Sequence, residues 1–531
     1  MTTVVAVAYF VIWAVISWLS SPSLDSYGDM VENYAWSQTL ALGTFKHPPL
    51  FAWIVGAWFA LFPTRVWAYY LLSYVNAAIG IAGIVCLARL WVPEAMSAAR
   101  RRAFLTAVAV FAALSFPYSN LAAKFNADTV LLSLWPWTAY ACFAALHAES
   151  PWRRSGFAVL FGVMAAAAMM GKYFSVLLLA TLLAVTVSHA DYRRWYRTRY
   201  PYLTAAVFAL ALLPHLLWEM RMDFPFRLYL ESKSDPAIDP GRIVLFLLSG
   251  VYYLALSWLA WLIARSRFRT IDVRPVTWAR PMNGLVVLSF LPALLTVSSN
   301  LVARVHLTTH WAIPVWFGLP ILMAAWLLPR IDEQLQSEQM VQGMAAFCAA
   351  LLVGGVVYTL VLSISGNQKY ALGRREMVRT IEERFASRFP SKRLSWAGGT
   401  WPESGALAFF AANHPRALPG LPDERRALAN PFPEWSDTYG VILCFASGVY
   451  AQEGSHDSAC EQDTRKWLGA HELPIAEETL TYRAEGWRYI RARPKNVTVF
   501  WLPPRASRGQ SGLPAGGGAR ENAVSGRAWP S

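Results

Sequence analysis

The sequence predicts a polytopic α-helical membrane protein that carries a small soluble domain at its C-terminal end. The chain has 531 residues, of which 56% are hydrophobic and only 15% are charged, whereas soluble proteins carry about a quarter charged residues. Apolar runs of about 20 residues, long enough to cross a bilayer, recur as far as about residue 365. The later residues have a soluble composition. We therefore expect a membrane domain over 1–365 and a soluble domain over 366–505.

The apolar runs predict about eleven transmembrane helices, with ends uncertain by a few residues. The first run, about 4–20, lacks a basic n-region and a small-x-small cleavage site, so we interpret it as a retained span rather than a signal peptide. The other predicted spans lie near 65–92, 103–118, 129–148, 156–170, 174–189, 202–219, 243–264, 283–298, 311–328 and 340–363.

The net charge of +14 follows the membrane topology rather than a nucleic-acid surface. Arginines cluster in alternate loops, such as 93–102 and 190–201, as expected for cytoplasmic loops. No groove-reading motif accompanies them, so nucleic acid is not an expected partner. This orientation places the first loop (21–64) and the C-terminal domain outside the cytoplasm.

The first outer loop contains the stretch "DMVENYAWSQTLALGTFKHPPLFAW", residues 29–53. Its aromatic and apolar spacing predicts two short helices along the membrane interface, the first with Tyr34 and Trp36 at headgroup depth and the second after the Pro pair. Asp29 and Glu32 would share one helix face.

Two interpretations of these carboxylates are open. Asp29 is either an ordinary helix cap beside a solvated Glu32, or one of the two acts as a general base or metal ligand, with Lys46 or His47 holding a phosphate. A carboxylate at an apolar boundary would have a raised pKa, which suits a base near neutral pH. Asp29, Glu32 and His47 are also acceptable ligands for a divalent ion, so the sequence leaves metal binding open.

Further ionisable residues lie at the outer ends of other spans. Lys172 follows a pure apolar run and abuts Tyr173, which favours a functional position because ions are rare at such boundaries. Asp128 either caps the fourth span or belongs to the site. His310 and Trp311 either line a cavity or mark the interface. The remaining cations either extend to lipid headgroups or meet a phosphate: Arg227, Arg304 and His306.

Four stretches occur in the order found in bacterial family 39 glycosyltransferases, relatives of the polyprenyl-phosphate-mannose protein mannosyltransferases and lipid A aminoarabinose transferases. Residues 29–50 resemble the first extracytoplasmic loop of that family. The stretches "KFNADTVLLSLWPWTAY" (124–140), "MMGKYFSVLLL" (169–179) and "RVHLTTHWAIPVW" (304–316) resemble later segments. The resemblance covers about residues 1–365 and implies the GT-C membrane fold.

The resemblance implies an enzyme of the bacterial cytoplasmic membrane that takes a sugar from a polyprenyl phosphate and passes it to a lipid, glycan or protein acceptor outside the cytoplasm. Asp29 would be the general base, with Glu32 as the second catalytic carboxylate because Met30 stands where many relatives have an acid. The implied phosphate-binding residues are Lys46, His47, Lys172, Tyr173 and Arg304. The other implied cavity residues are Asp128, Arg227, His306 and His310. No cofactor is expected to be required, although a divalent metal is compatible.

A transporter or lipid flippase without covalent chemistry is the competing interpretation. Such a protein should carry ionisable residues at the centres of its spans, along a transport path. Here the span centres are nearly free of charge, and the charges gather at the outer ends. This distribution favours a site at one membrane surface.

The C-terminal segment has short strand-like runs, "YGVILCFA" and "VTVFWLPP", which predict a small mixed α/β domain. Its location suggests that it covers the site and positions the acceptor. Cys444 and Cys460 could be bonded if the domain is extracytoplasmic, and the sequence does not decide this. The Gly/Ser/Pro-rich tail, 506–531, is predicted to be disordered.

Overall fold

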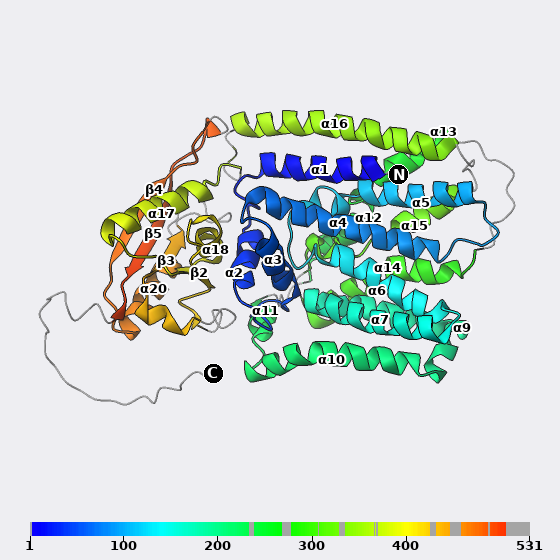
Figure 1. Ribbon diagram of the computed structural model, residues 1–531, viewed down its shortest axis with the longest axis horizontal. Helices are drawn as coiled ribbons and strands as arrows, with labels where there is room; N and C mark the ends of the chain where they lie inside the picture. Colours follow the sequence, from blue (N-terminus) through cyan, green and yellow to red (C-terminus); the bar gives the residue numbers. More distant parts are fainter. Residues whose placement is uncertain are drawn as a thin grey trace, which may run out of the picture.

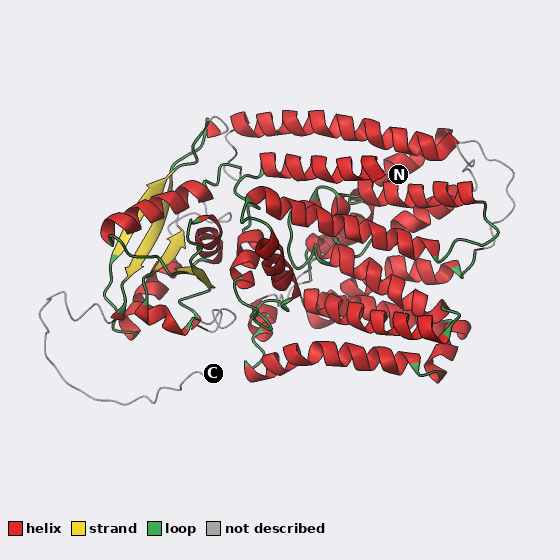
Figure 2. Cartoon of the chain, in the orientation of Figure 1, coloured by secondary structure: helices red, strands yellow, loops and turns green. Residues whose placement is uncertain are grey.

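The structure, a computed structural model, consists of a helical bundle with a sheet domain at one of its ends (Figure 1). Figure 2 shows that helix dominates the bundle and that the strands are confined to this second part. The described residues are 3–232, 238–267, 278–305, 307–328, 335–365, 367, 370–424, 432–445, 458–486 and 489–505. The tail 506–531 and His306 lie outside the described residues.

Every apolar run predicted to span the membrane contains a helix. The helices of the bundle are α1 (Thr3–Ser20), α4 (Val66–Arg89), α5 (Ala98–Leu114), α6 (Leu131–His147), α7 (Pro151–Gly171), α8 (Val176–Ser188), α10 (Tyr200–Arg221), α12 (Pro240–Tyr252), α13 (Ala255–Arg267), α14 (Met282–Ala303), α15 (Leu319–Leu327) and α16 (Leu335–Ser365). The predicted span 243–264 is broken into α12 and α13, which meet at a bend of 45°.

Six of the described helices are long and apolar enough to cross a membrane, or up to nine if each bent pair is counted as one span. The predicted total of about eleven is not tested by this criterion, because α6 and α15 are too short for it. Both of these helices are almost entirely buried inside the bundle.

The long helices run back and forth, so the connections alternate between the two ends of the bundle (Figure 1). The Arg-rich segment with α9 (Ala190–Arg193) and the 3₁₀ helix η4 (Arg194–Arg197) lies at the end away from the sheet domain. The first loop, with α2 (Asp29–Ser37) and α3 (Leu50–Leu61), lies at the other end, together with α11 (Phe226–Ser232) and the sheet domain. Asp29, Glu32, Lys46 and His47, which the sequence predicts to carry function, thus lie in the first loop at this end.

The C-terminal part is a mixed α/β fold, as predicted. Its five-stranded sheet has the order β2-β1-β3-β5-β4, with β1, β2 and β3 parallel and β5 antiparallel to both β3 and β4. The strands are β1 (Trp396–Gly399), β2 (Arg416–Pro419), β3 (Gly440–Phe445), β4 (Glu477–Tyr482) and β5 (Lys495–Leu502), and the helices are α17 (Arg374–Arg388), α18 (Trp401–Phe410) and α20 (Ser458–Ala470). Both strand-like runs read from the sequence form strands, β3 and β5. A disulfide joins Cys444 to Cys460.

The first helix of the loop 21–64 forms where the sequence predicts it, but it does not lie at an exposed interface. Tyr34 and Trp36 are buried, so neither ring is exposed to lipid headgroups, and their depth relative to the headgroups stays a prediction. The reason is tertiary, because α18 of the sheet domain packs against α2 and covers it. Gly405 of α18 makes the contact possible, since a Cβ there would come within 2.6 Å of the Val31 carbonyl oxygen.

Replacing Gly405 with Ala should therefore destabilise the contact between the sheet domain and α2. A methyl group forced against backbone should cost about 1–3 kcal/mol, more than the roughly 1 kcal/mol that Ala gains over Gly inside a helix. Gly469→Ala is the matched control, because nothing lies within 4 Å of a Cβ at that helical position. Thermal unfolding in detergent should show a lower melting temperature for Gly405→Ala alone, and equal melting of the two variants would contradict the packing argument.

Candidate functional site

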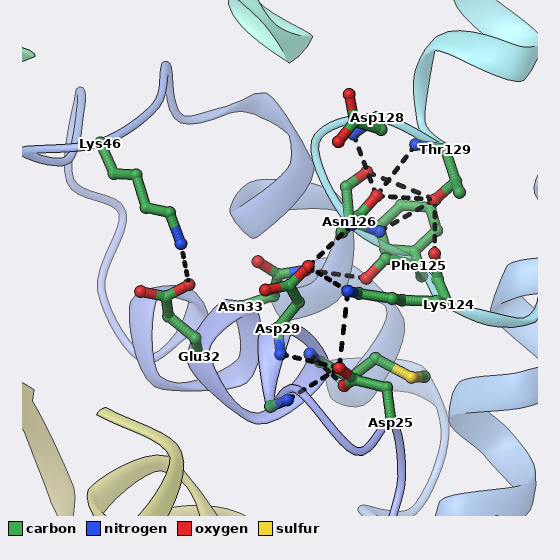
Figure 3. Close-up of polar contacts among 12 residues, drawn as sticks. Asp25, Asp29, Glu32, Asn33, Lys46, Lys124, Phe125, Asn126, Asp128 and Thr129 are labelled. Atoms are coloured by element: carbon green, nitrogen blue, oxygen red, sulfur yellow. Dashed lines mark hydrogen bonds and ion pairs between the residues drawn. The ribbon is translucent and has the colours of Figure 1, made fainter. Parts of the chain in front are cut away.

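The N-terminus of α2 is organised by the carboxylate of Asp25 rather than by Asp29 (Figure 3). The two oxygens of Asp25 accept hydrogen bonds from the backbone amides of Gly28, Asp29 and Met30, at 2.8–3.0 Å. These amides have no carbonyl partner within the helix, so a carboxylate placed beside them is favoured. The interpretation of Asp29 as an ordinary helix cap is therefore wrong, and the Asp29 side chain is left to make other contacts.

Asp29 contacts the loop that enters α6. Its Oδ2 lies 2.6 Å from Nζ of Lys124 and accepts a hydrogen bond of 2.9 Å from Nδ2 of Asn126. The Asn126 amide is fixed in turn, because its Oδ1 accepts from the backbone amides of Asp128 and Thr129. A second contact ties α2 to this loop, as Nδ2 of Asn33 donates to the Phe125 carbonyl at 2.8 Å.

These partners keep Asp29 ionised. Burial by itself would raise its pKa, but the ammonium groups of Lys124 and Lys46, with the hydrogen bonds from Lys124 and Asn126, hold the pKa of Asp29 below its ordinary value. The expectation that a carboxylate at the apolar boundary has a raised pKa is therefore wrong for Asp29. The positive charges of Lys124 and Lys46 and the hydrogen bonds to Asp29 lower its pKa by more than burial raises it.

Glu32 is the carboxylate whose pKa is raised. Its Oε2 lies 2.9 Å from Nζ of Lys46, and the side chains are 3% and 16% exposed. Burial raises the pKa of Glu32 to about 7, although Lys46 pulls it down, and the negative charge of Asp29 adds to the rise. Lys46 also lies over the ring of Trp401, 5.1 Å from its centroid, and so contacts the sheet domain.

A third ion pair joins Lys172 to Asp128 at the same end of the bundle. Lys172 directly follows the last residue of α7, and its ammonium group faces the rings of Phe174 and Trp311, at 5.9 and 5.4 Å from their centroids. The sequence singled out both Lys172 and Asp128, and the structure brings them together. Because Asp128 pairs with this ammonium group, its side chain belongs to the polar cluster.

Tyr173 points away from this pair, into a buried contact with α10. Its hydroxyl lies 2.7 Å from Nε2 of His215 and donates to Oε1 of Glu219 at 2.8 Å. The other ring nitrogen of His215 lies 2.6 Å from the Leu42 carbonyl oxygen. Tyr173 thus helps to hold α10 against the first loop through His215, and its predicted contact with a phosphate stays a prediction.

The remaining predicted residues lie outside the paired cluster. The ring of His47 packs against those of Phe51 and Tyr229, with centroids 5.9 and 5.2 Å apart. Arg227 is exposed and stacks on Phe224. Arg304 and His310 are exposed, and among the described residues no hydrogen bond or ion pair links them to the cluster. From the segment 304–316 it is Trp311, rather than His310, that reaches Lys172.

Three members of the cluster are not among the residues predicted from sequence: Asp25, Lys124 and Asn126. Asp25 lies four residues before Asp29, the first residue of α2, whereas the sequence signals for a helix start are a cap immediately before the helix and acids in its first turn. Lys124 and Asn126 lie in the stretch 124–140, whose resemblance to the family was noted without assigning them a role. Their pairing with Asp29 depends on the approach of two loops that are far apart in sequence.

The lysines of the cluster are all engaged by carboxylates rather than free to bind an anion. Each of the lysines Lys46, Lys124 and Lys172 is paired with a carboxylate. Such pairing is expected, because a buried charge without a partner is strongly unfavourable. Among the described residues, no group of three or more His, Cys, Asp and Glu side chains is placed to hold a metal ion. An anion entering the site must therefore share or displace a carboxylate partner of one of these lysines.

Comparisons with known proteins agree with this architecture. Residues 46–218 match the family described as dolichyl-phosphate-mannose-protein mannosyltransferase. The chain is similar to the crystal structure of ArnT from Cupriavidus metallidurans in the apo state, with 14% sequence identity and a TM-score of 0.60. It is also similar to the structure of ArnT from Cupriavidus metallidurans bound to undecaprenyl phosphate, with 15% sequence identity and a TM-score of 0.52. Each comparison covers 93% of this chain and 97% of the other. No curated protein sequence matches the chain. The resemblance to family 39 glycosyltransferases is thereby confirmed, and the fold is that of the GT-C proteins.

Because burial raises the pKa of Glu32 to about 7, an infrared titration of the purified protein should show a carboxyl C=O band that disappears with a midpoint near neutral pH. Glu32→Gln should remove this band, and Lys46→Met should move the midpoint upward because the ammonium group favours the ionised acid. Asp191→Asn, on an exposed side chain at the opposite end, is the control. A neutral-pH band that survives Glu32→Gln would show that another group titrates there.

Proposed function

From the GT-C fold that this chain shares with ArnT, we propose that the protein is a membrane glycosyltransferase that moves a sugar from a polyprenyl-phosphate donor to a lipid, glycan or protein acceptor. Asp29 is the general base, and the reaction takes place on the extracytoplasmic side. The family match and the ArnT structure bound to undecaprenyl phosphate support this class of donor. The observation that carries the proposal is the position of Asp29, the first residue of α2, which is half-buried and ionised at the end of the bundle that the sheet domain covers.

In the proposed reaction an acceptor hydroxyl gives its proton to the Asp29 carboxylate as its oxygen attacks the anomeric carbon of the donor sugar. The bond from that carbon to the phosphate oxygen breaks, and the polyprenyl phosphate leaves with the bonding electrons. A general base must be ionised before the step begins, which Lys124 and Asn126 ensure for Asp29. The same two groups hold the carboxylate in a fixed direction, which favours catalysis by positioning.

The leaving phosphate needs positive charge, and Lys46 and Lys172 are the candidates within the cluster. Burial raises the pKa of Glu32 to about 7, and protonation of Glu32 removes the negative charge that pairs with the ammonium group of Lys46. Protonation of Glu32 therefore favours phosphate binding by Lys46. His47 and Arg304 stay proposed phosphate ligands, and Tyr173 contributes by holding the first loop against α10 through His215.

Two observations support an extracytoplasmic site. The Arg-rich segment of α9 and η4 lies at the end of the bundle away from the sheet domain, as the positive-inside rule expects of a cytoplasmic loop. The disulfide between Cys444 and Cys460 suits an oxidising compartment. A single cysteine introduced on the exposed surface of α17 can be labelled with a thiol reagent in intact cells and in inverted membrane vesicles. The labelling shows on which side of the membrane the sheet domain lies.

Transport without covalent chemistry is less well supported. The paired charges Asp29–Lys124, Glu32–Lys46 and Asp128–Lys172 all lie on connections at one end of the bundle. A transport path would place such groups near the middle of the spans. The arrangement suits a reaction at a membrane surface.

Asp29→Asn tests the proposed function. Membranes given a polyprenyl-phosphate sugar should transfer the sugar to an endogenous acceptor, and the variant should lose about 10²–10⁴-fold in rate because the general base is gone. Asp191→Asn should keep the activity, since that side chain is exposed at the opposite end. Full activity of Asp29→Asn would overturn the assignment of the base. Movement of the donor across vesicles without any sugar transfer would favour a transporter.

Glu32 should also give donor binding a pH dependence. Below its pKa of about 7 the protonated Glu32 no longer holds Lys46 as an ion pair, so the KM for the donor should fall as the pH is lowered from about 8 to about 6. The expected change in KM is about tenfold, which corresponds to about 1.4 kcal/mol. This lies near the lower end of the roughly 1.5–3 kcal/mol that a hydrogen bond to a charged group contributes. Glu32→Gln should give a low KM that does not change over this range. A pH-dependent KM in that variant would assign the titration to another group.

A further inference from the structure

A buried arginine of the sheet domain contacts the loop that precedes α2. Arg374 is the first residue of α17 and is 5% exposed. Its Nη1 donates to the carbonyl oxygens of Ser23 and Asp25, at 2.8 and 2.7 Å. A guanidinium group can satisfy two acceptors from a fixed planar position, which a lysine does less well.

This contact continues directly to Asp29. One of the two carbonyl oxygens that accept from Arg374 belongs to Asp25. The carboxylate of Asp25 in turn accepts hydrogen bonds from the backbone amides of Gly28, Asp29 and Met30. Arg374 thus fixes the backbone of the residue that caps α2, and Asp29 is the first residue of this helix. The path from the sheet domain to the Asp29 backbone consists of hydrogen bonds of ordinary length.

Close packing at Gly28 shows how tightly the domain fits this loop. A Cβ on Gly28 would lie 2.9 Å from Cβ of Pro402, and 3.1 Å from both Nη2 of Arg374 and the Trp401 ring. All three neighbours belong to the sheet domain. Gly28 also has φ +97°, a conformation that other residues rarely adopt. The backbone just before Asp29 is therefore held in a special conformation against the surface of that domain.

We propose that Arg374 is a positioning residue for Asp29, and that the sheet domain is a working part of the transferase site because it fixes the loop 23–28. This inference rests on the proposed function of Asp29. Without the guanidinium group, the carbonyl oxygens of Ser23 and Asp25 lose their donor, and an acceptor left unsatisfied away from water destabilises the conformation that holds it. The loop can then relax, and the direction of Asp29 toward its partners Lys124 and Asn126 is no longer fixed.

The opposite end of α2 provides a matched control. Arg416, also in the sheet domain, donates from Nη1 to the carbonyl oxygen of Gln38 at 2.7 Å. Gln38 follows the last residue of α2, so this contact joins the same two parts of the protein at the end of the helix away from Asp29. If these arginines only attach the domain, their loss should have similar effects.

The experiment compares Arg374→Gln, Arg374→Lys and Arg416→Gln in the full-length protein, using sugar transfer from a polyprenyl-phosphate sugar. For Arg374→Gln, kcat should fall about 10–100-fold, because a shift of about 1 Å at a reacting group can cost about 10²-fold. The KM for the donor should stay within about twofold. Arg374→Lys should recover part of the loss in kcat, since lysine still carries a donor. Arg416→Gln should have a kcat close to that of the wild-type protein.

Hydrogen–deuterium exchange gives a readout that does not need activity. Exchange over the amides of residues 28–30 should become faster in Arg374→Gln and partly faster in Arg374→Lys, but not in Arg416→Gln. Equal effects of the Gln variants on kcat and exchange would overturn the proposal, as would unchanged exchange in Arg374→Gln. If the unchanged protein transfers no sugar, the proposed function fails, and the exchange measurement still decides whether Arg374 holds this loop.

Discussion

The arrangement of the whole site depends on the hydrogen bonds that Asp25 accepts at the start of α2. A short helix in a membrane-protein loop has amides that need acceptors and little intrinsic stability of its own. The Asp25 carboxylate satisfies three of these amides. Because Asp25 does this, Asp29 is not used as a cap and can face the loop 124–129. The capping residue and the proposed base are thus separate carboxylates with separate tasks.

The second constraint is the cost of burying charge. The cluster holds carboxylates and ammonium groups where water is largely excluded, and each lysine in it has an acidic partner. Such pairs remove the penalty of an isolated buried ion, but they leave little free positive charge for a phosphate. Asp29 and Glu32 therefore differ in the direction in which their pKa is shifted. Several favourable partners keep Asp29 ionised, while burial dominates at Glu32 and places its titration near neutral pH.

The sheet domain is joined to the membrane part through the site itself. Arg374 donates to the backbone of the first loop, and the ring of Trp401 contacts Lys46. Helix α18 packs along α2. A helix that would otherwise lie at the membrane interface is enclosed between two folded parts. Enclosure of this kind excludes water and strengthens electrostatic interactions within the site. The position of the domain therefore affects both the geometry and the charge states of the proposed catalytic residues.

The sequence by itself determined the helical membrane class, the location of each long helix and the two strands β3 and β5, because length, hydropathy and alternation are properties of local segments. It also identified Asp29, Glu32, Lys46, Asp128 and Lys172 as polar groups at one end of the spans. Only the tertiary structure decided which charges pair, since Asp29 meets Lys124 and Asn126 through the approach of distant loops. It likewise decided that α2 is buried and that Arg374 anchors the loop before it, because the covering surface and this arginine come from a domain more than three hundred residues further along the chain.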